Sequence, residues 1–186
     1  MKKSILLIIL IAIAFYSCDR RGSHREHLQK SISEFNNKQT NIDIVTYYPE
    51  RYTEVKTDSI ISNTFKVSIK NYSKMDSQIL VSSQANKKKT TLNYHRVFES
   101  EIQITTNSKT ILNTTISAQD FRDYSQSEFW NHATLEHVWV NQDASNRNEL
   151  NLGVSIINPK NKAYKLYELV VNTEGKQQLY LIEEHS

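Results

Sequence analysis

The side chains best suited to chemistry lie in the segment 129–141, which holds His132, Glu136 and His137. Two imidazoles and a carboxylate could bind Zn²⁺, which needs at least three protein ligands. The two histidines are five residues apart, which misses the i, i+4 spacing of ligands on one helix face, and His95 is a candidate third ligand from elsewhere in the chain. Because metal sites normally show ligand spacing, we expect ordinary hydrogen bonds from these histidines and keep a metal-dependent hydrolase as an alternative.

Aromatic side chains supply a second candidate chemistry. Trp130, Trp139 and Tyr94 could stack on sugar rings, because their faces are apolar and they carry a polar group at the rim. Aromatic residues of strands more often fill the core. Core packing is therefore the favoured interpretation, and a glycan-binding surface is the alternative.

Motifs for covalent catalysis are absent from the sequence. The chain has three glycines, Gly22, Gly153 and Gly175, and none belongs to a G-x-S-x-G elbow or a phosphate-binding loop. Glu99 and Glu101 would share one face of a strand, as paired glycosidase carboxylates can, but we expect them on the solvent side. The sequence therefore predicts no catalytic residue, no metal and no cofactor.

The N-terminus has the pattern of an export signal. Lys2 and Lys3 precede an uninterrupted apolar run from Ile5 to Tyr16. This run is shorter than the roughly 18–20 residues that a membrane-spanning helix needs, and its length is typical of a signal-peptide core. We predict that residues 1–17 are a cleaved signal peptide.

The single cysteine, Cys18, stands directly after this leader. The stretch Phe15-Tyr16-Ser17-Cys18 resembles a lipobox, in the loose form found in lipoproteins of Bacteroidota, where the peptidase cuts before a lipid-modified cysteine. Two or three acyl chains hold a protein on a membrane where one chain does not. We therefore predict that Cys18 is lipidated and tethers the chain to a membrane.

The charge of the chain argues against nucleic acid as a partner. Removal of Lys2 and Lys3 with the leader lowers the formal net charge from +3 to +1. A nearly neutral domain has no general electrostatic attraction to a polyanion.

The elements that must position these side chains are mainly strands. Residues 18–41 form a lipidated N-terminus and tether, with a short helix marked by apolar Leu28, Ile32 and Phe35. From residue 42 to 186 the period is two, which predicts one antiparallel β-sandwich domain, with a closed β-barrel as the alternative. Strand candidates include 65–70, 78–82, 90–98, 100–106, 109–117, 134–141, 149–157, 163–172 and 177–183.

Turns and a helical insertion separate several of these strands. Asn107-Ser108 and the stretch ending at Gly175 predict hairpin loops, and 158–161 predicts a type I turn. Capping-box spacing predicts two short helices, 118–124 and 126–133, which cover one end of the sheet.

A three-residue signal gives a candidate modification site. Asp58-Ser59-Ile60 resembles the Asp-Ser/Thr-apolar pattern for O-glycosylation of exported Bacteroidota proteins, which would place the glycan on Ser59.

Four stretches together resemble an uncharacterised family of Bacteroidota lipoproteins, classed as a domain of unknown function. They are TDSIISNTFKVSIKNYS (57–73), YHRVFESEI (94–102), FWNHATLEHVWVN (129–141) and YKLYELVVNTEGKQ (164–177). The resemblance implies an envelope location and a single domain. It implies no activity, so no site residue follows from it.

These expectations together describe a membrane-anchored bacterial lipoprotein that is not an enzyme and acts as a binding or structural module. Its lipid anchor would hold it in the cell envelope, with the periplasmic face of the outer membrane favoured. Its partner would be a glycan or another envelope protein, and not nucleic acid.

Overall fold

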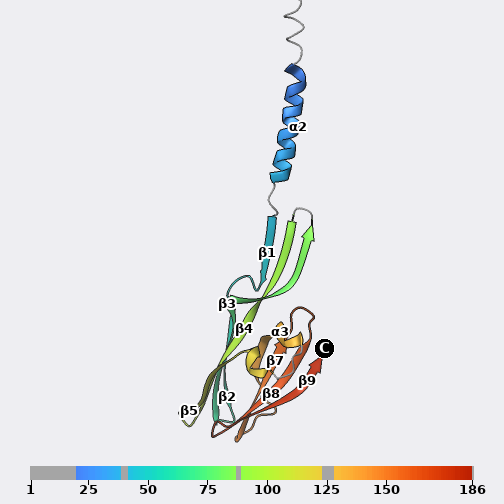
Figure 1. Cartoon of the computed structure of the whole chain (residues 1–186). Coiled ribbons are helices and arrows are strands. Elements are labelled where there is room, and N and C mark those ends of the chain that lie inside the picture. Colours follow the sequence, from blue (N-terminus) through green and yellow to red (C-terminus); the bar gives the residue numbers. More distant parts are fainter. Residues whose placement is uncertain (1–19, 39–41, 87–88, 123–127, 186) are drawn as a thin grey trace, which may run out of the picture. The chain divides into compact units, whose positions relative to one another are not determined.

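The computed structural model describes residues 20–38, 42–86, 89–122 and 128–185 (Figure 1). The predicted signal peptide and Cys18 lie outside these residues. The chain forms two compact units, one made of 1–42 with 86–89 and a larger one made of 43–85 with 90–186.

The helix predicted in the tether is α2, Arg20–Lys38, and its 19 residues make it longer than expected. Its apolar stripe of Leu28, Ile32 and Phe35 is present, and all three side chains are exposed. No helix in the described part of the chain has both the length and the apolar character needed to cross a membrane.

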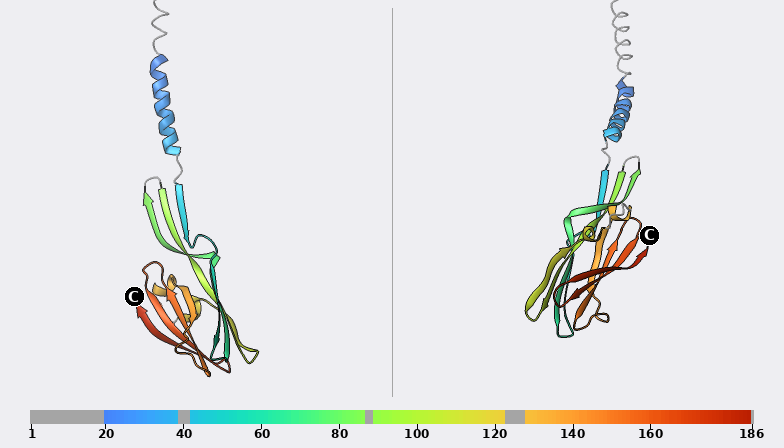
Figure 2. Two further views of the ribbon diagram at one scale, coloured as in Figure 1. Left: turned by 180° about the vertical axis from the view of Figure 1, so that it is seen from behind. Right: turned by 60° about the horizontal axis from the view of Figure 1, so that its bottom comes forward.

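The larger unit is built from two sheets of mainly antiparallel strands (Figures 1 and 2). The first, sheet A, has the order β1-β4-β3-β2, with β5 also paired to β4. Its strands are β1 Ile42–Tyr48, β2 Glu54–Ile61, β3 Phe65–Asn86, β4 Lys89–Thr106 and β5 Lys109–Ile116. Sheet B has the order β6-β7-β8-β9. Its strands are β6 Thr134–Val140, β7 Glu149–Ile157, β8 Tyr164–Asn172 and β9 Gln177–His185.

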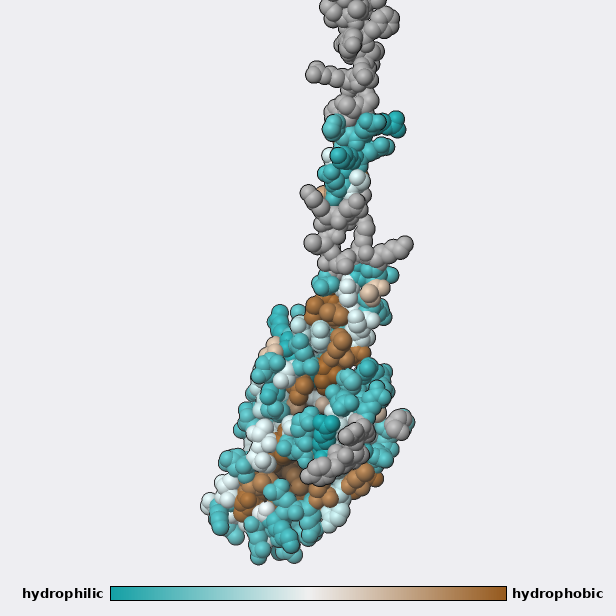
Figure 3. Space-filling model, viewed as in Figure 1, coloured by the Kyte–Doolittle hydropathy of each residue, from teal (hydrophilic) through white to brown (hydrophobic). Residues whose placement is uncertain are grey.

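Two strands are much longer than predicted. β3 joins the predicted strands 65–70 and 78–82, and β4 joins 90–98 and 100–106. The residues between the predicted strands are polar, which hid the continuity from a search for apolar alternation. Figure 3 shows hydrophobic surface over β1. The side chains of Ile44 and Val45 in this strand are exposed.

The tight turns follow from residues that accept left-handed backbone. Asn107 and Ser108 have φ values of 49° and 64°, which confirms the predicted two-residue hairpin between β4 and β5. Gly175 has φ of 85° and closes the β8–β9 hairpin, also as predicted. The loop at 158–161 is wider than a type I turn, because the backbone N–H of Lys162 donates to the carbonyl of Asn158 at 2.8 Å.

The core lies between the two sheets. Alternate residues of the strands that face each other point inward and are buried, among them Phe65, Val67, Ile69, Ile102 and Ile104 of sheet A and Leu135, Val138, Leu150, Leu152, Val154 and Ile156 of sheet B. The sheets do not close into a barrel, so the barrel alternative is wrong and the sandwich prediction is confirmed.

A buried amide joins the two sheets. Asn71 of β3 is 5% exposed, and its side-chain nitrogen donates to the carbonyl of Val138 on β6 at 3.0 Å. Its side-chain oxygen accepts from the backbone N–H of Val138 at 2.9 Å and from the Ser100 hydroxyl. Because buried polar groups are costly when unpaired, this arrangement fixes β6 against β3.

The described residues contain both parts of the predicted helical insertion, a 3-10 turn, η2 Ala118–Phe121, and a helical turn, α3 Glu128–Asn131. Residues 123–127, which belong in part to both predicted helices, lie outside the described residues. At η2 the Asp120 carboxylate accepts hydrogen bonds from the backbone N–H and the hydroxyl of Ser117, as the capping-box spacing indicated.

Candidate functional site

The most distinctive exposed side chain of the sandwich is Trp139, on the outer face of β6. Its neighbour Val138 points into the core, so strand alternation sends the indole outward, where it is 36% exposed. Trp139 pairs with Gly153 of β7. A Cβ atom added to Gly153 would lie 2.3 Å from Cε2 and Cζ2 of the indole, so the ring lies across the glycine. The glycine thus allows the indole to lie against the sheet.

A second ring adjoins the indole. His137 lies two residues earlier on β6, and its ring centroid is 6.0 Å from that of Trp139, with the planes inclined by 13°. Next to these rings, the Ser155 hydroxyl donates to the Glu136 carboxylate at 2.6 Å. Two nearly parallel rings therefore have polar groups at their border.

The register of sheet B continues this surface across all four strands. Gly153 pairs with Glu168 of β8, and Glu168 pairs with Tyr180 of β9. The neighbours of Glu168, Tyr167 and Leu169, are buried, so Glu168 points outward. We name Trp139, Gly153, Glu168 and Tyr180 the aromatic row. With about 4.8 Å between strands, the row spans roughly 14 Å from β6 to β9.

The aromatic row offers two kinds of contact to a ligand. Trp139 and the half-exposed Tyr180 present apolar ring faces, and Glu168 between them presents hydrogen-bond acceptors. The Tyr180 hydroxyl donates to the side-chain oxygen of Gln178 at 2.6 Å, which orients the ring. An apolar platform with a few placed polar groups is the usual composition of a small-molecule or sugar site.

The structure separates the three aromatic residues proposed for glycan binding. Trp130 is 2% exposed and packs edge-on against Phe129 in the core, so it cannot contact a ligand. Tyr94 lies on sheet A, where it stacks on Tyr47 with centroids 5.6 Å apart. Of the three, Trp139 alone belongs to the aromatic row.

The histidine segment does not gather into a metal site. Within the described ranges, no group of three or more His, Cys, Asp or Glu side chains could hold a metal ion. His137 lies beside Trp139, whereas His95 contacts Tyr48 and Phe98. The weak candidates His132, Glu136 and His137 therefore gain no support as a ligand set.

The paired carboxylates Glu99 and Glu101 lie on the outer face of sheet A, as expected, and both are in ion pairs. Lys74 Nζ is 3.0 Å from Glu99 and Lys70 Nζ is 2.7 Å from Glu101, and these hydrogen bonds raise the pKa of both lysines. The Tyr72 hydroxyl also donates to Glu99 at 2.9 Å. Burial, followed by this hydrogen bond, raises the pKa of Tyr72 to about 12. These carboxylates are engaged within the sheet.

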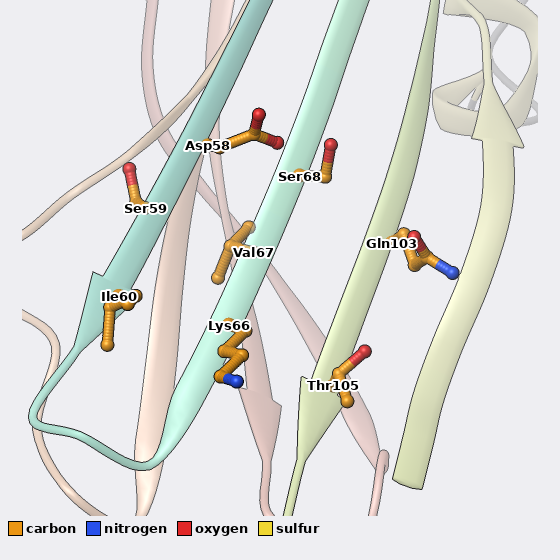
Figure 4. A pocket seen from close by; sticks show the side chains of 8 residues that line it. All are labelled: Asp58, Ser59, Ile60, Lys66, Val67, Ser68, Gln103 and Thr105. Atoms are coloured by element: carbon orange, nitrogen blue, oxygen red, sulfur yellow. The ribbon is translucent and has the colours of Figure 1, made fainter. Parts of the chain in front are cut away.

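The proposed glycosylation site lies at the edge of sheet A. Asp58, Ser59 and Ile60 belong to β2 and line an open cavity of about 340 Å³ (Figure 4). Asp58 turns toward Ser68, whose hydrogen bond lowers the pKa of this carboxyl. Ser59 pairs with the buried Val67 and is half-buried. The Ser59 hydroxyl faces the core side of an edge strand. Glycosylation of Ser59 stays a prediction.

Sequence reasoning missed three members of the aromatic row: Gly153, Glu168 and Tyr180. The available signal was Gly153, an isolated glycine in the apolar run of β7, because such a glycine often marks the close approach of another group. The pairing of Glu168 and Tyr180 with it depends on strand register, which the sequence does not show.

In comparisons with known proteins, no family model and no curated protein matches the chain. The resemblance to a family of Bacteroidota lipoproteins stays a prediction.

Proposed function

We propose that this chain is a lipid-anchored protein of the bacterial cell envelope whose β-sandwich binds a glycan on the outer face of sheet B and performs no catalysis. One observation carries the glycan proposal: the exposed indole of Trp139 lies across Gly153, in register with Glu168 and Tyr180. The anchor is supported by the leader and by Cys18.

The chemistry of a sugar ring fits this surface. One face of a pyranose is made of C–H groups, which pack on an aromatic face, while its hydroxyl groups point outward around the ring. The Glu168 carboxylate lies one strand from Gly153 and would accept hydrogen bonds from such hydroxyls. The row is long enough for more than one sugar unit, which favours a polysaccharide over a monosaccharide.

The fold gives no other reason for an exposed indole at this position. The core is already filled from both sheets, and the side chain of Trp139 lies on the opposite face of β6 from Val138. Covering the exposed part of an indole contributes about 1–2 kcal/mol to binding, which is about 5- to 30-fold in affinity.

Binding of the full chain to immobilised envelope polysaccharides, with purified peptidoglycan among them, tests the glycan proposal. Trp139→Ala should weaken binding about tenfold or more, and Trp139→Phe should keep part of it. Tyr52→Ala is the matched control, since Tyr52 is an aromatic residue of similar exposure outside sheet B. Absence of binding by the unsubstituted chain, or equal binding by Trp139→Ala, contradicts the proposal.

The anchor has its own test. Labelled palmitate should enter the native product, and Cys18→Ser should abolish both the label and the membrane association. A Cys18→Ser protein of the same mature size that stays on the membrane would contradict lipidation and would leave the glycan proposal standing.

A further inference from the structure

The rings of the aromatic row differ from other rings of the chain in having no cationic side chain above them. Elsewhere in the described residues a Lys or Arg lies 4.2–5.9 Å from a ring centre, over Tyr47, Tyr72, Phe129 and Trp130. Among the same residues, no Lys or Arg lies over Trp139 or Tyr180. Because an indole attracts cations more strongly than any other side-chain ring, Trp139 is suited to a cation that the ligand brings.

The outer face of sheet B supplies no permanent positive charge of its own. Strands β6 to β9 contain one Lys and no Arg. That residue, Lys165, shares the inner face with the buried Tyr167 two residues away, and it forms an ion pair with Glu184. The basic groups on the outer face are His137 and His185, and a histidine carries no permanent charge.

One carboxylate on this face has no partner. Glu136 accepts a hydrogen bond from the Ser155 hydroxyl, and Glu183 accepts one from the Tyr164 hydroxyl. Glu168, by contrast, makes no side-chain hydrogen bond and no ion pair with any described residue. Its negative charge is therefore available to a ligand.

This carboxylate lies beside the indole. Gly153 is directly opposite Glu168, and a Cβ atom on Gly153 would lie 2.3 Å from two atoms of the Trp139 ring. Directly opposite residues have Cβ atoms about 4.5–5.5 Å apart, so the first side-chain atom of Glu168 is about 5 Å from the place where the indole crosses Gly153. A group that lies on the indole is within reach of the Glu168 carboxylate.

From the uncovered indole, the unpaired Glu168 beside it and the lack of Lys and Arg on this face, we infer that the aromatic row binds a cationic glycan, whose amino sugars carry free ammonium groups. The ammonium group lies near the indole face and donates hydrogen bonds to Glu168, while the C–H face of the sugar packs on Trp139. The inference rests on the proposed glycan binding and specifies the class of glycan.

A basic peptide carries the same charge but fits this face less well. The backbones of β7 and β8 are paired with neighbouring strands on both sides. A peptide lying on the face therefore cannot form main-chain hydrogen bonds with them, which are a major source of affinity for extended peptides. Only side chains contact a ligand there, and an amino sugar offers them an apolar face next to its amine.

Titration calorimetry of the full chain with two tetramers of one backbone tests the inference. The probes are the glucosamine tetramer derived from chitosan, which has free amines, and the N-acetylated tetramer derived from chitin. We expect the glucosamine tetramer to bind about tenfold more tightly, since its ammonium groups interact with both the ring and the carboxylate.

Glu168→Gln removes the charge and keeps the size of the side chain. It should abolish the preference for the glucosamine tetramer and leave the affinity for the N-acetylated tetramer unchanged, which also shows that the fold and the ring contacts are intact. Glu174→Gln is the matched control, because Glu174 is exposed in the turn between β8 and β9 and its loss changes the net charge equally. This control should keep the preference.

Several results would overturn the cationic glycan. They are equal or tighter binding of the N-acetylated tetramer, binding of neither tetramer, and equal effects of Glu168→Gln and Glu174→Gln. Tighter binding of tetralysine than of the glucosamine tetramer would overturn it in favour of a basic peptide. Binding of a neutral polysaccharide that Trp139→Ala weakens would leave the proposed glycan function standing in each of the first three cases.

Discussion

The two outer faces of the sandwich differ in how their side chains are engaged. On sheet A the charged groups pair with one another, as Lys70 does with Glu101 and Lys74 with Glu99. On sheet B the corresponding face carries Trp139 across Gly153 and the exposed ring of Tyr180. One face satisfies its own polar groups, whereas the other leaves apolar rings and acceptors for a ligand.

This difference shows where to look for function in a sandwich. Exposed ion pairs contribute little to stability and keep a surface soluble. An exposed indole is not needed for solubility, and the filled core does not need it for stability. The physical reason for its presence is therefore to be sought in a ligand, and the following predictions test the contrast between the two faces.

The largest expected effect is on the link that holds the two sheets together. Asn71→Leu would leave the N–H and C=O of Val138 without their buried partner. We expect a loss of about 2–4 kcal/mol in the free energy of unfolding, measured by urea denaturation. Asn113→Leu is the control, because Asn113 is exposed on β5 and should change stability by less than about 0.5 kcal/mol. Equal effects of the two variants would show that the amide does not join the sheets.

The next largest effect is expected where the Trp139 indole lies against Gly153. Gly153→Val would push Trp139 off the sheet, because the first side-chain atom already overlaps the ring. We expect loss of glycan binding by tenfold or more, with a loss of about 1–3 kcal/mol in stability from overpacking. The control on the other face is Gln103→Val, at an exposed position of β4, which should leave binding unchanged. Unchanged binding of Gly153→Val would remove the aromatic row from the site.

The smallest expected effect is on how the free energy of unfolding depends on pH, through Tyr72 of sheet A. Burial and Glu99 raise the pKa of Tyr72 from 10.0 to about 12, so the folded state keeps a proton that the unfolded chain loses. Its stabilising contribution is complete below pH 10.0 and is lost as the pH rises toward about 12. In Tyr72→Phe, urea unfolding should show a shallower fall in stability over this range. An identical slope in both proteins would contradict the raised pKa.

The sequence by itself determined the class of the fold and much of its local geometry. Alternation with period two predicted strands within β3 to β9, because most of these strands bury one face, but it did not single out β1 or β2. Asn107-Ser108 and Gly175 predicted their turns, because few residue types adopt a left-handed backbone at low energetic cost. Such features depend on neighbours along the chain, which the sequence displays directly.

Only the tertiary structure decided which residues lie together. Trp130 and Trp139 were equal candidates in the sequence, but one packs in the core and the other lies on the outer face of β6. Gly153, Glu168 and Tyr180 joined Trp139 through the register of β6 to β9. A shift of one residue in that register would send each side chain to the opposite face. Packing across the whole sandwich determines this register, and no local sequence pattern predicts it.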